Sequence, residues 1–193
     1  MGIEYEVKFR ADRETQTAIR EAYAGLEQEF SMHTTYYDTP SGSLSARYYT
    51  LRRRMENEQS ICTLKAPISG CGRGEWETVC DCISDAIEEL CKLGAPKDLP
   101  VLAAEGLLAV CGAKFNRLAK TVTLEAATFE LALDEGILYG GGKELPLCEV
   151  EVELKNGEPS ACIAFAQSLA EQFSLEPEEK SKFRRALALY QGE

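Results

Sequence analysis

The sequence is poor in several features that would assign a protein to a class at once. Its 193 residues contain one histidine and seven prolines, and they show no apolar run near 18 residues and no Pro-rich or Ser-rich linker. We therefore expect no membrane-spanning helix and a single domain over residues 1–193. The chain also lacks the basic and then apolar start of a secretory signal, which predicts a cytoplasmic protein.

Positive charge is scarce as well. The 21 Lys and Arg residues face 32 Asp and Glu residues, so the formal net charge is −11. Because such a chain repels nucleic acid and anionic membranes, we expect neither as a partner. Taken alone, the same balance also argues against a polyanionic substrate.

The eight cysteines have none of the spacings that mark a metal site. There is no C-x-x-C pair, and only His33 could add an imidazole ligand, so a zinc site is not expected. A disulfide framework is not expected in a reduced compartment either. We predict that these cysteines are small apolar residues with free thiols.

Hydrophobic periodicity switches between two and 3.6 residues, which is typical of an α+β domain. Alternation predicts strands at 3–9, 32–38, 49–55, 59–66, 74–82, 113–119, 121–127, 128–134 and 144–154. Apolar stripes predict helices at 12–26, 84–94 and 101–110, and two more that begin near Pro159 and Glu178. Because the strands mostly follow one another directly, an antiparallel sheet or barrel with peripheral helices is favoured.

Several of these strands carry charge along one face. Residues 4–8 and 149–155 place Glu-x-Glu on one face, whereas 52–54 and 63–65 place Arg or Lys there. A solvated sheet surface is the simplest explanation. The apolar faces also need covering, however, so the helices could wrap the outside of a curled sheet and leave the charged faces to the interior.

A charged interior of this kind has a chemical use. Carboxylates two apart on a strand lie about 6–7 Å apart and can hold a hard cation through oxygen. Guanidinium and ammonium groups bind phosphate oxygens. Acids on some strands and bases on others therefore suit a metal ion together with a polyanion.

The residues also resemble a known family. Glu4-Tyr5-Glu6-Val7-Lys8 has the E-x-E-x-K pattern of the CYTH superfamily, also called triphosphate tunnel metalloenzymes. Further landmarks follow in order: Tyr36-Tyr37-Asp38-Thr39, Leu51-Arg52-Arg53-Arg54, Thr63-Leu64-Lys65, Glu130 to Gly136, Glu149 to Glu153, and Lys180-Ser181-Lys182. The resemblance implies a closed antiparallel β-barrel of about eight strands, with a charged tunnel inside and helices outside.

The resemblance also implies a site. By motif, the metal ligands would be Glu4, Glu6, Asp134, Glu149, Glu151 and Glu153, and the metal would be Mg²⁺ or Mn²⁺. The substrate-binding residues would be Lys8, Arg52, Arg54, Lys65, Arg73, Arg117, Lys180 and Lys182. Arg73 enters by strand parity alone, and Lys180 competes with Lys182 for one terminal role. Glu4, Glu6 and Lys8 would form the catalytic group.

The implied activity is metal-dependent hydrolysis of inorganic triphosphate, with nucleoside triphosphates as further substrates. A class IV adenylate cyclase, which makes cyclic AMP and pyrophosphate from ATP, and a thiamine triphosphatase are alternatives within the family. A non-catalytic module that binds polyphosphate or nucleotide is an alternative of another class. In each case the acidic composition indicates a need for metal, because without a cation such a chain should bind triphosphate poorly.

Overall fold

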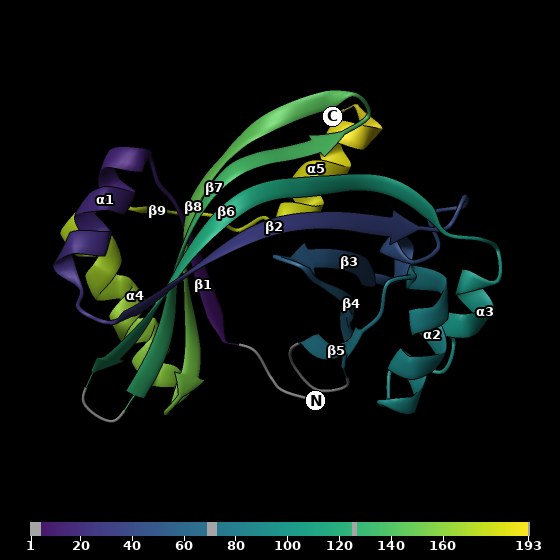
Figure 1. Cartoon of the computed structure of the whole chain (residues 1–193), viewed down its shortest axis with the longest axis horizontal. Helices are drawn as coiled ribbons and strands as arrows, with labels where there is room; N and C mark the ends of the chain where they lie inside the picture. The colour runs from purple at the N-terminus through teal and green to yellow at the C-terminus, as the bar shows by residue number, and fades with distance from the viewer. Residues whose placement is uncertain (1–4, 69–72, 125–126, 193) are drawn as a thin grey trace.

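The computed structural model describes residues 5–68, 73–124 and 127–192, which form one large antiparallel sheet with helices packed against it (Figure 1). The strands are β1 (Glu6–Arg10), β2 (Leu26–Asp38), β3 (Thr50–Glu56), β4 (Gln59–Pro67), β5 (Arg73–Val79), β6 (Leu108–Leu124), β7 (Ala127–Gly140), β8 (Lys143–Asn156) and β9 (Glu176–Pro177). The helices are α1 (Arg13–Ala22), α2 (Ile83–Lys92), α3 (Leu99–Ala103), α4 (Pro159–Phe173) and α5 (Lys182–Gln191), with a 3-10 turn at Ser45–Arg47. The predicted α+β class is confirmed.

Strand boundaries differ most from the prediction in the second half of the chain. The two strands predicted at 113–119 and 121–127 are one long strand, β6, because the residue between them, Lys120, is no turn. Its buried ammonium donates to the carbonyls of Arg20 and Tyr23, which closes the C-terminal end of α1. The helix predicted at 101–110 ends at Ala103, and Gly106 then adopts a left-handed φ of 105° that leads into β6.

The sheet is open, so the prediction of a closed barrel was wrong. Its strand order is β5-β4-β3-β2-β6-β7-β8-β1-β9, and no ladder among the described residues joins the two ends. The outer edge of β1 is already used, because Phe9 and Arg10 pair with Pro177 and Glu176 of β9. Glu178 adds a backbone bond to Lys8. This short segment, with a proline that has no N–H to donate, ends the ladder at β1.

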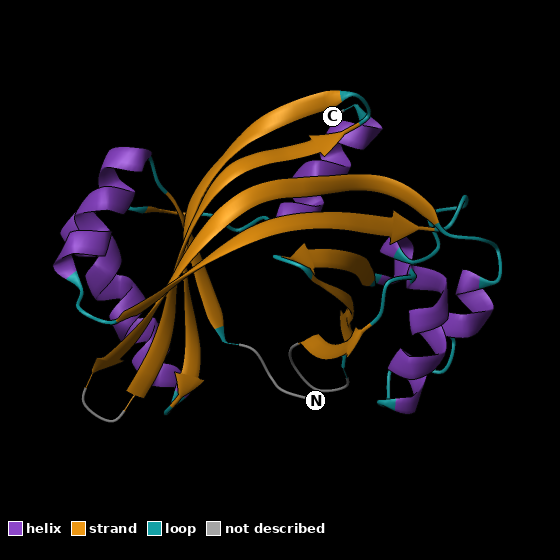
Figure 2. Cartoon of the chain, viewed as in Figure 1, coloured by secondary structure: helices purple, strands orange, loops and turns teal. Residues whose placement is uncertain are grey.

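Helices cover the outer face of the sheet at its two ends (Figure 2). At one end, Phe165 and Leu169 of α4 and Ile19 of α1 pack on Phe9 and Val150. At the other end, α2 and α3 cover β4 and β5, and Trp76 is buried there. The described cysteines, all but Cys71, carry free thiols, and no helix in the described residues is long and apolar enough to cross a membrane.

The last helix, α5, departs from the prediction that all helices lie outside. Phe183 and Ala186 pack against Tyr36, Phe115 and Leu147, which share strand faces with the charged residues. The ring centroids of Tyr36 and Phe183 are 5.0 Å apart. The helix begins at Lys182 rather than near Glu178, since the Ser181 hydroxyl accepts a hydrogen bond from the backbone N–H of Arg184 at 3.2 Å. The fold thus places the start of α5 against the inner, charged face of the sheet.

Candidate active site

The inner face of the curled sheet surrounds a cavity of ≈ 540 Å³. Each of the strands β1 to β8 contributes at least one side chain to its lining, together with Ser181, Lys182 and Phe183 at the start of α5. The basic residues on this lining are Lys8, Arg52, Arg54, Lys65, Arg73, Arg117, Lys155 and Lys182, and the acidic ones are Glu6, Glu56, Glu75, Glu77, Glu130, Glu151 and Glu153. Bases thus slightly outnumber acids on the described lining, although acids dominate the whole chain.

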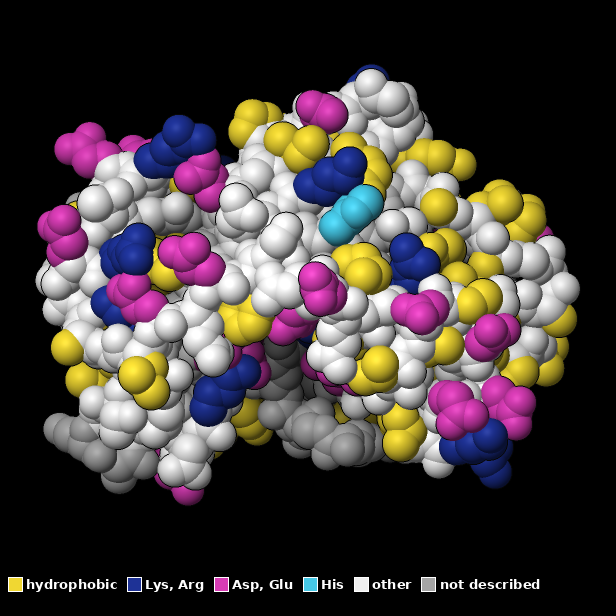
Figure 3. All heavy atoms as spheres, viewed as in Figure 1, with side chains coloured by type: hydrophobic (Ala, Val, Ile, Leu, Met, Phe, Trp, Pro, Cys, Tyr) yellow, Lys and Arg dark blue, Asp and Glu magenta, His cyan; other side chains and the backbone are white. Residues whose placement is uncertain are grey.

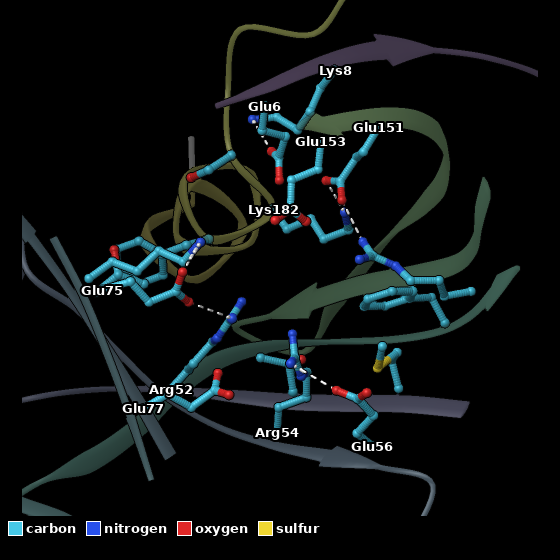
Figure 4. A pocket seen from close by; sticks show the side chains of 18 of the residues that line it. Glu6, Lys8, Arg52, Arg54, Glu56, Glu75, Glu77, Glu151, Glu153 and Lys182 are labelled. Atoms are coloured by element: carbon cyan, nitrogen blue, oxygen red, sulfur yellow. Dashed lines mark hydrogen bonds and ion pairs between the residues drawn. The ribbon is translucent and has the colours of Figure 1, made fainter. Parts of the chain in front are cut away.

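Two opposite walls of the cavity differ in character (Figure 4). Glu6, Glu151 and Glu153 lie beside Lys182 on one side, and Arg52 and Arg54 lie across from them. On the molecular face shown in Figure 3, acidic and basic side chains are interspersed rather than gathered into a patch of one sign. Both walls of the cavity carry acids as well as bases, and the arginines lie on the wall across from Glu6, Glu151 and Glu153.

Strand parity builds the basic wall from β3, β4 and β5. Arg52 and Lys65 both lie 3.4 Å from the carboxylate of Glu75, and Arg54 lies 2.8 Å from that of Glu56. The Nε atoms of Arg52 and Arg54 are buried and have no hydrogen-bond acceptor among the described residues. Burial lowers the pKa of Arg54, and the neighbouring charge of Arg52 lowers it further. An anion in the cavity would supply both the missing acceptors and the missing negative charge.

Arg73, at the start of β5, has a different local role. Its guanidinium donates to the carbonyls of Tyr48 and Lys65 and to the hydroxyl of Thr50. These bonds fasten the edge of the sheet to β3 and β4 beside the basic wall. Arg73 therefore lines the cavity and also connects β5 to β4 and to the start of β3.

The acidic wall comes from β1, β7 and β8. In the ladder Glu6 lies opposite Glu153 and Lys8 lies opposite Glu151, which brings the acids of β1 and β8 side by side. Lys8 lies 3.7 Å from Glu6, and Lys155 lies 2.8 Å from Glu153. Carboxylate oxygens concentrated in this way are suitable ligands for a hard divalent cation.

An inner cluster lies behind this wall. Carboxylate oxygens of Asp134, Glu149 and Glu151 all lie within 4.8 Å of one another, and all three residues are buried. Lys182 reaches into the cluster, with its Nζ 2.8 Å from Asp134 and 2.7 Å from Glu151, and it also pairs with Glu149. Arg117 holds Asp134 with two hydrogen bonds of 2.7 Å. The cluster is a compact ion-pair network.

The pKa values of the cluster follow from burial and pairing. Burial alone would lower the pKa of Lys182, but the carboxylates of Asp134, Glu151 and Glu149 outweigh it and raise that pKa. Burial would raise the pKa of Glu151, yet Lys182 and Arg117 hold it well below its usual range. For Glu149 burial prevails, and its pKa is raised.

The structure brings most of the predicted residues together. Those on the cavity lining are Glu6, Lys8, Arg52, Arg54, Lys65, Arg73, Arg117, Glu151, Glu153 and Lys182. Asp134 and Glu149 lie behind Lys182, off the lining. Lys180 is exposed, so Lys182 is the lysine that reaches the site. Glu4 lies outside the described residues.

Some site residues were missed by the sequence analysis. Glu56 and Lys155 line the cavity, and each continues the parity of its strand, two residues after Arg54 and Glu153 respectively. Arg185 pairs with Glu149 and follows Lys182 by three residues on α5. Parity would have found the first two, and helical spacing would have found the third.

Fold and cavity together define a class of protein: an antiparallel sheet curled around a cavity lined by many acidic and basic side chains. The CYTH domain family model matches residues 2–187, so the chain belongs to the CYTH domain family. The predicted family is confirmed.

Relatives agree with this assignment. The chain is 27% identical over 166 residues to an inorganic triphosphatase of Haemophilus influenzae, a match that covers 84% of this chain and 47% of the relative. The chain thus spans about half the length of that curated relative.

Solved structures share the fold. A putative adenylyl cyclase from Hippeastrum, described as having a dominant triphosphatase activity, superposes with a TM-score of 0.69 at 17% identity, over 100% of this chain and 96% of the other. A putative adenylate cyclase from Bacillus halodurans gives a TM-score of 0.64 at 19% identity, over 95% and 96%. These similarities concern the fold.

Proposed function

We propose that this protein is a divalent-metal-dependent triphosphatase that hydrolyses inorganic triphosphate. The main support is the pair of buried, unmatched Nε atoms of Arg52 and Arg54, which face a carboxylate-rich wall across one cavity. Such a pairing of walls suits a phosphate chain on one side and a cation on the other. The inorganic triphosphatase relative supports the choice of substrate.

The basic wall would bind the phosphate chain. Arg52, Arg54 and Lys65 come from neighbouring strands and would donate hydrogen bonds to successive phosphate oxygens. Binding would draw Arg52 and Lys65 away from Glu75, which holds both of them at 3.4 Å. Lys182 and Lys8 would approach the chain from the opposite wall.

The acidic wall fits a cation such as Mg²⁺ or Mn²⁺, because its donors are carboxylate oxygens. Glu6, Glu151 and Glu153 line the cavity and would hold the ion there. When bound, the ion supplies a Lewis acid that offsets charge on the phosphate oxygens. Asp134 and Glu149 were predicted as ligands too, and Glu4 remains a predicted one. In our proposal, Asp134 and Glu149 instead balance the cations of the inner cluster.

The reaction would be an in-line displacement. Water attacks the terminal phosphorus, the bond from that phosphorus to its bridging oxygen breaks, and the products are orthophosphate and pyrophosphate. The carboxylate of Glu6 or Glu153 would accept the proton of the attacking water. Arg52 and Arg54 would stabilise the negative charge that develops on the leaving pyrophosphate.

A substrate panel with product identification tests the proposal. Triphosphate, ATP and thiamine triphosphate are each incubated with Mg²⁺ or Mn²⁺, and the products are separated. We expect orthophosphate and pyrophosphate from triphosphate, loss of activity with EDTA, and at least about a tenfold lower rate for Glu6→Gln. Glu144→Gln, on the exposed part of β8, is the matched control and should retain the rate.

Other outcomes identify the alternatives. Cyclic AMP and pyrophosphate from ATP would identify an adenylate cyclase, and preferential cleavage of thiamine triphosphate would identify a thiamine triphosphatase. Tight triphosphate binding without turnover under either metal would show a binding module. Each of these results would overturn the proposal.

A further inference from the structure

Arg185 is a charged residue of α5 that lies next to the site without lining the cavity. Its side chain is 13% exposed, and it pairs with Glu149 through Nη2 and with Glu178 through Nη1, the latter at 3.6 Å. The cavity lining from α5 consists of Ser181, Lys182 and Phe183. Arg185 therefore does not line the cavity, and it can affect a ligand there only through the residues that it contacts.

Glu149 connects Arg185 to Lys182. Its carboxylate is fully buried, with one oxygen accepting a hydrogen bond from Lys182 and the other accepting one from Arg185. The two cations project from the first turn of α5 at i and i+3, so they share one face of the helix. A single carboxylate on β8 thus holds both of them.

Arg185 is itself fixed from the other side. Glu178 is buried, and its carboxylate accepts hydrogen bonds from Nε of Arg10 and from the backbone N–H of Lys180, each at 3.0 Å. Glu178 therefore ties the guanidinium of Arg185 to β1 and to the segment before α5. The ion pairs run in a chain from Arg10 through Glu178, Arg185 and Glu149 to Lys182.

Charge balance shows what Arg185 contributes. The inner cluster has three acids, Asp134, Glu149 and Glu151, and three bases, Lys182, Arg117 and Arg185. Without Arg185 the buried acids exceed the bases by one, and Glu149 keeps only Lys182 as a partner. The ammonium, which already contacts Glu149, would then be held there more strongly and would be less available to a ligand in the cavity.

We infer that Arg185 is a positioning residue for Lys182: by sharing Glu149 with it, Arg185 keeps the Lys182 ammonium at the cavity wall, within reach of a substrate phosphate. The contact between Lys182 and a substrate phosphate rests on the proposed function. The half that concerns the position of Lys182 holds for the protein without substrate.

Steady-state kinetics with triphosphate and Mg²⁺ test the first half. We expect Arg185→Met to raise KM about tenfold with kcat within about twofold, because ground-state contact with phosphate is weakened. Arg184→Met, the exposed neighbour on the same helix, is the matched control and should leave both constants unchanged. Adding Glu149→Gln to Arg185→Met restores the balance of charge and should return KM to within about threefold of the original. A residue that only stabilised the fold would give a double variant worse than either single one.

Acylation of Lys182 tests the second half without substrate. A small amine-acylating reagent is applied to the folded protein, and modification of Lys182 is measured by peptide mass spectrometry. We expect slower acylation of Lys182 in Arg185→Met than in Arg184→Met, since the carboxylates around the amine, Glu149 above all, then hold it more tightly. Equal or faster acylation would overturn the inference, as would a KM equal to that of Arg184→Met. If the unmodified protein neither binds nor cleaves triphosphate, the proposed function fails, and acylation alone decides the inference.

Discussion

The basic wall and the inner cluster both contain Lys and Arg side chains beside carboxylates, but the side chains are paired to different degrees. In the inner cluster, Lys182 and Arg117 are surrounded by carboxylates at 2.7–2.8 Å. On the basic wall, Arg52 and Lys65 share one carboxylate at 3.4 Å, and buried Nε atoms lack acceptors. The inner cluster pairs its carboxylates with its own cations, although the buried Nε of Arg185 has no acceptor among the described residues, whereas in our proposal a phosphate chain completes the basic wall. Mutations in the inner cluster should therefore have their largest effect on stability, whereas mutations on the basic wall should change binding with little change in stability.

The largest effect is expected from the centre of the inner cluster. Lys182→Met leaves three buried carboxylates without their shared cation, which should lower the free energy of unfolding by about 3–5 kcal/mol. Urea denaturation at pH 7 measures the change. Lys180→Met, two residues away and exposed, should change the same quantity by less than about 0.5 kcal/mol. Equal stabilities for the two variants would contradict the contrast between the regions.

A smaller effect, on binding rather than folding, is expected at the basic wall. Arg52→Met removes charge-assisted hydrogen bonds to phosphate, each worth about 1.5–3 kcal/mol, so kcat/KM for triphosphate should fall about 10- to 100-fold. The free energy of unfolding should be preserved, because a buried and incompletely paired cation is removed. Arg53→Met is the matched control, since Arg53 faces outward and donates to the carbonyl of Asp81 at 2.8 Å. Comparable loss in both variants would show that the wall has no special role.

The smallest effect concerns pH. Burial would raise the pKa of Glu178, but the N–H of Lys180 and the charges of Arg10 and Arg185 lower it from its usual 4.5. A carboxyl group with a lowered pKa contributes stability above its unfolded pKa and loses it as pH falls through the folded value. Glu178→Gln should therefore be less stable than the native chain at pH 7, and the difference should shrink below about pH 4.5. Urea midpoints at pH 7 and pH 3 measure it, and a constant difference would argue against the pairing.

Much of the site was predictable because strand parity is a local property. Alternation places Glu6 with Lys8 and Glu151 with Glu153 on one face of their strands, and the β1–β8 ladder then brings these residues together. The acidic net charge was the misleading feature. It describes the far field, while the cavity lining carries a slight excess of bases that parity directs to one side.

The predictions that failed depend on contacts between distant segments. The sheet is not closed among the described residues, and Glu176 and Pro177 pair with Phe9 and Arg10 at the edge of β1, a partner that nothing in the alternation of residues 3–9 indicates. Likewise, the stripe of α5 shows an apolar face but not which side of the sheet it covers. That choice brings Phe183 against Tyr36 and brings Lys182 into the acidic cluster.

The sequence by itself thus determined which side chains share a face, because a strand repeats every two residues regardless of its neighbours. It also determined the family, through motifs spread along the chain. Only the tertiary structure decided which charged groups are paired within the protein and which buried Nε atoms lack an acceptor among the described residues. The pairing of these charges depends on where α5 and β9 lie against the sheet. Their positions are set by packing between segments that are far apart in the chain.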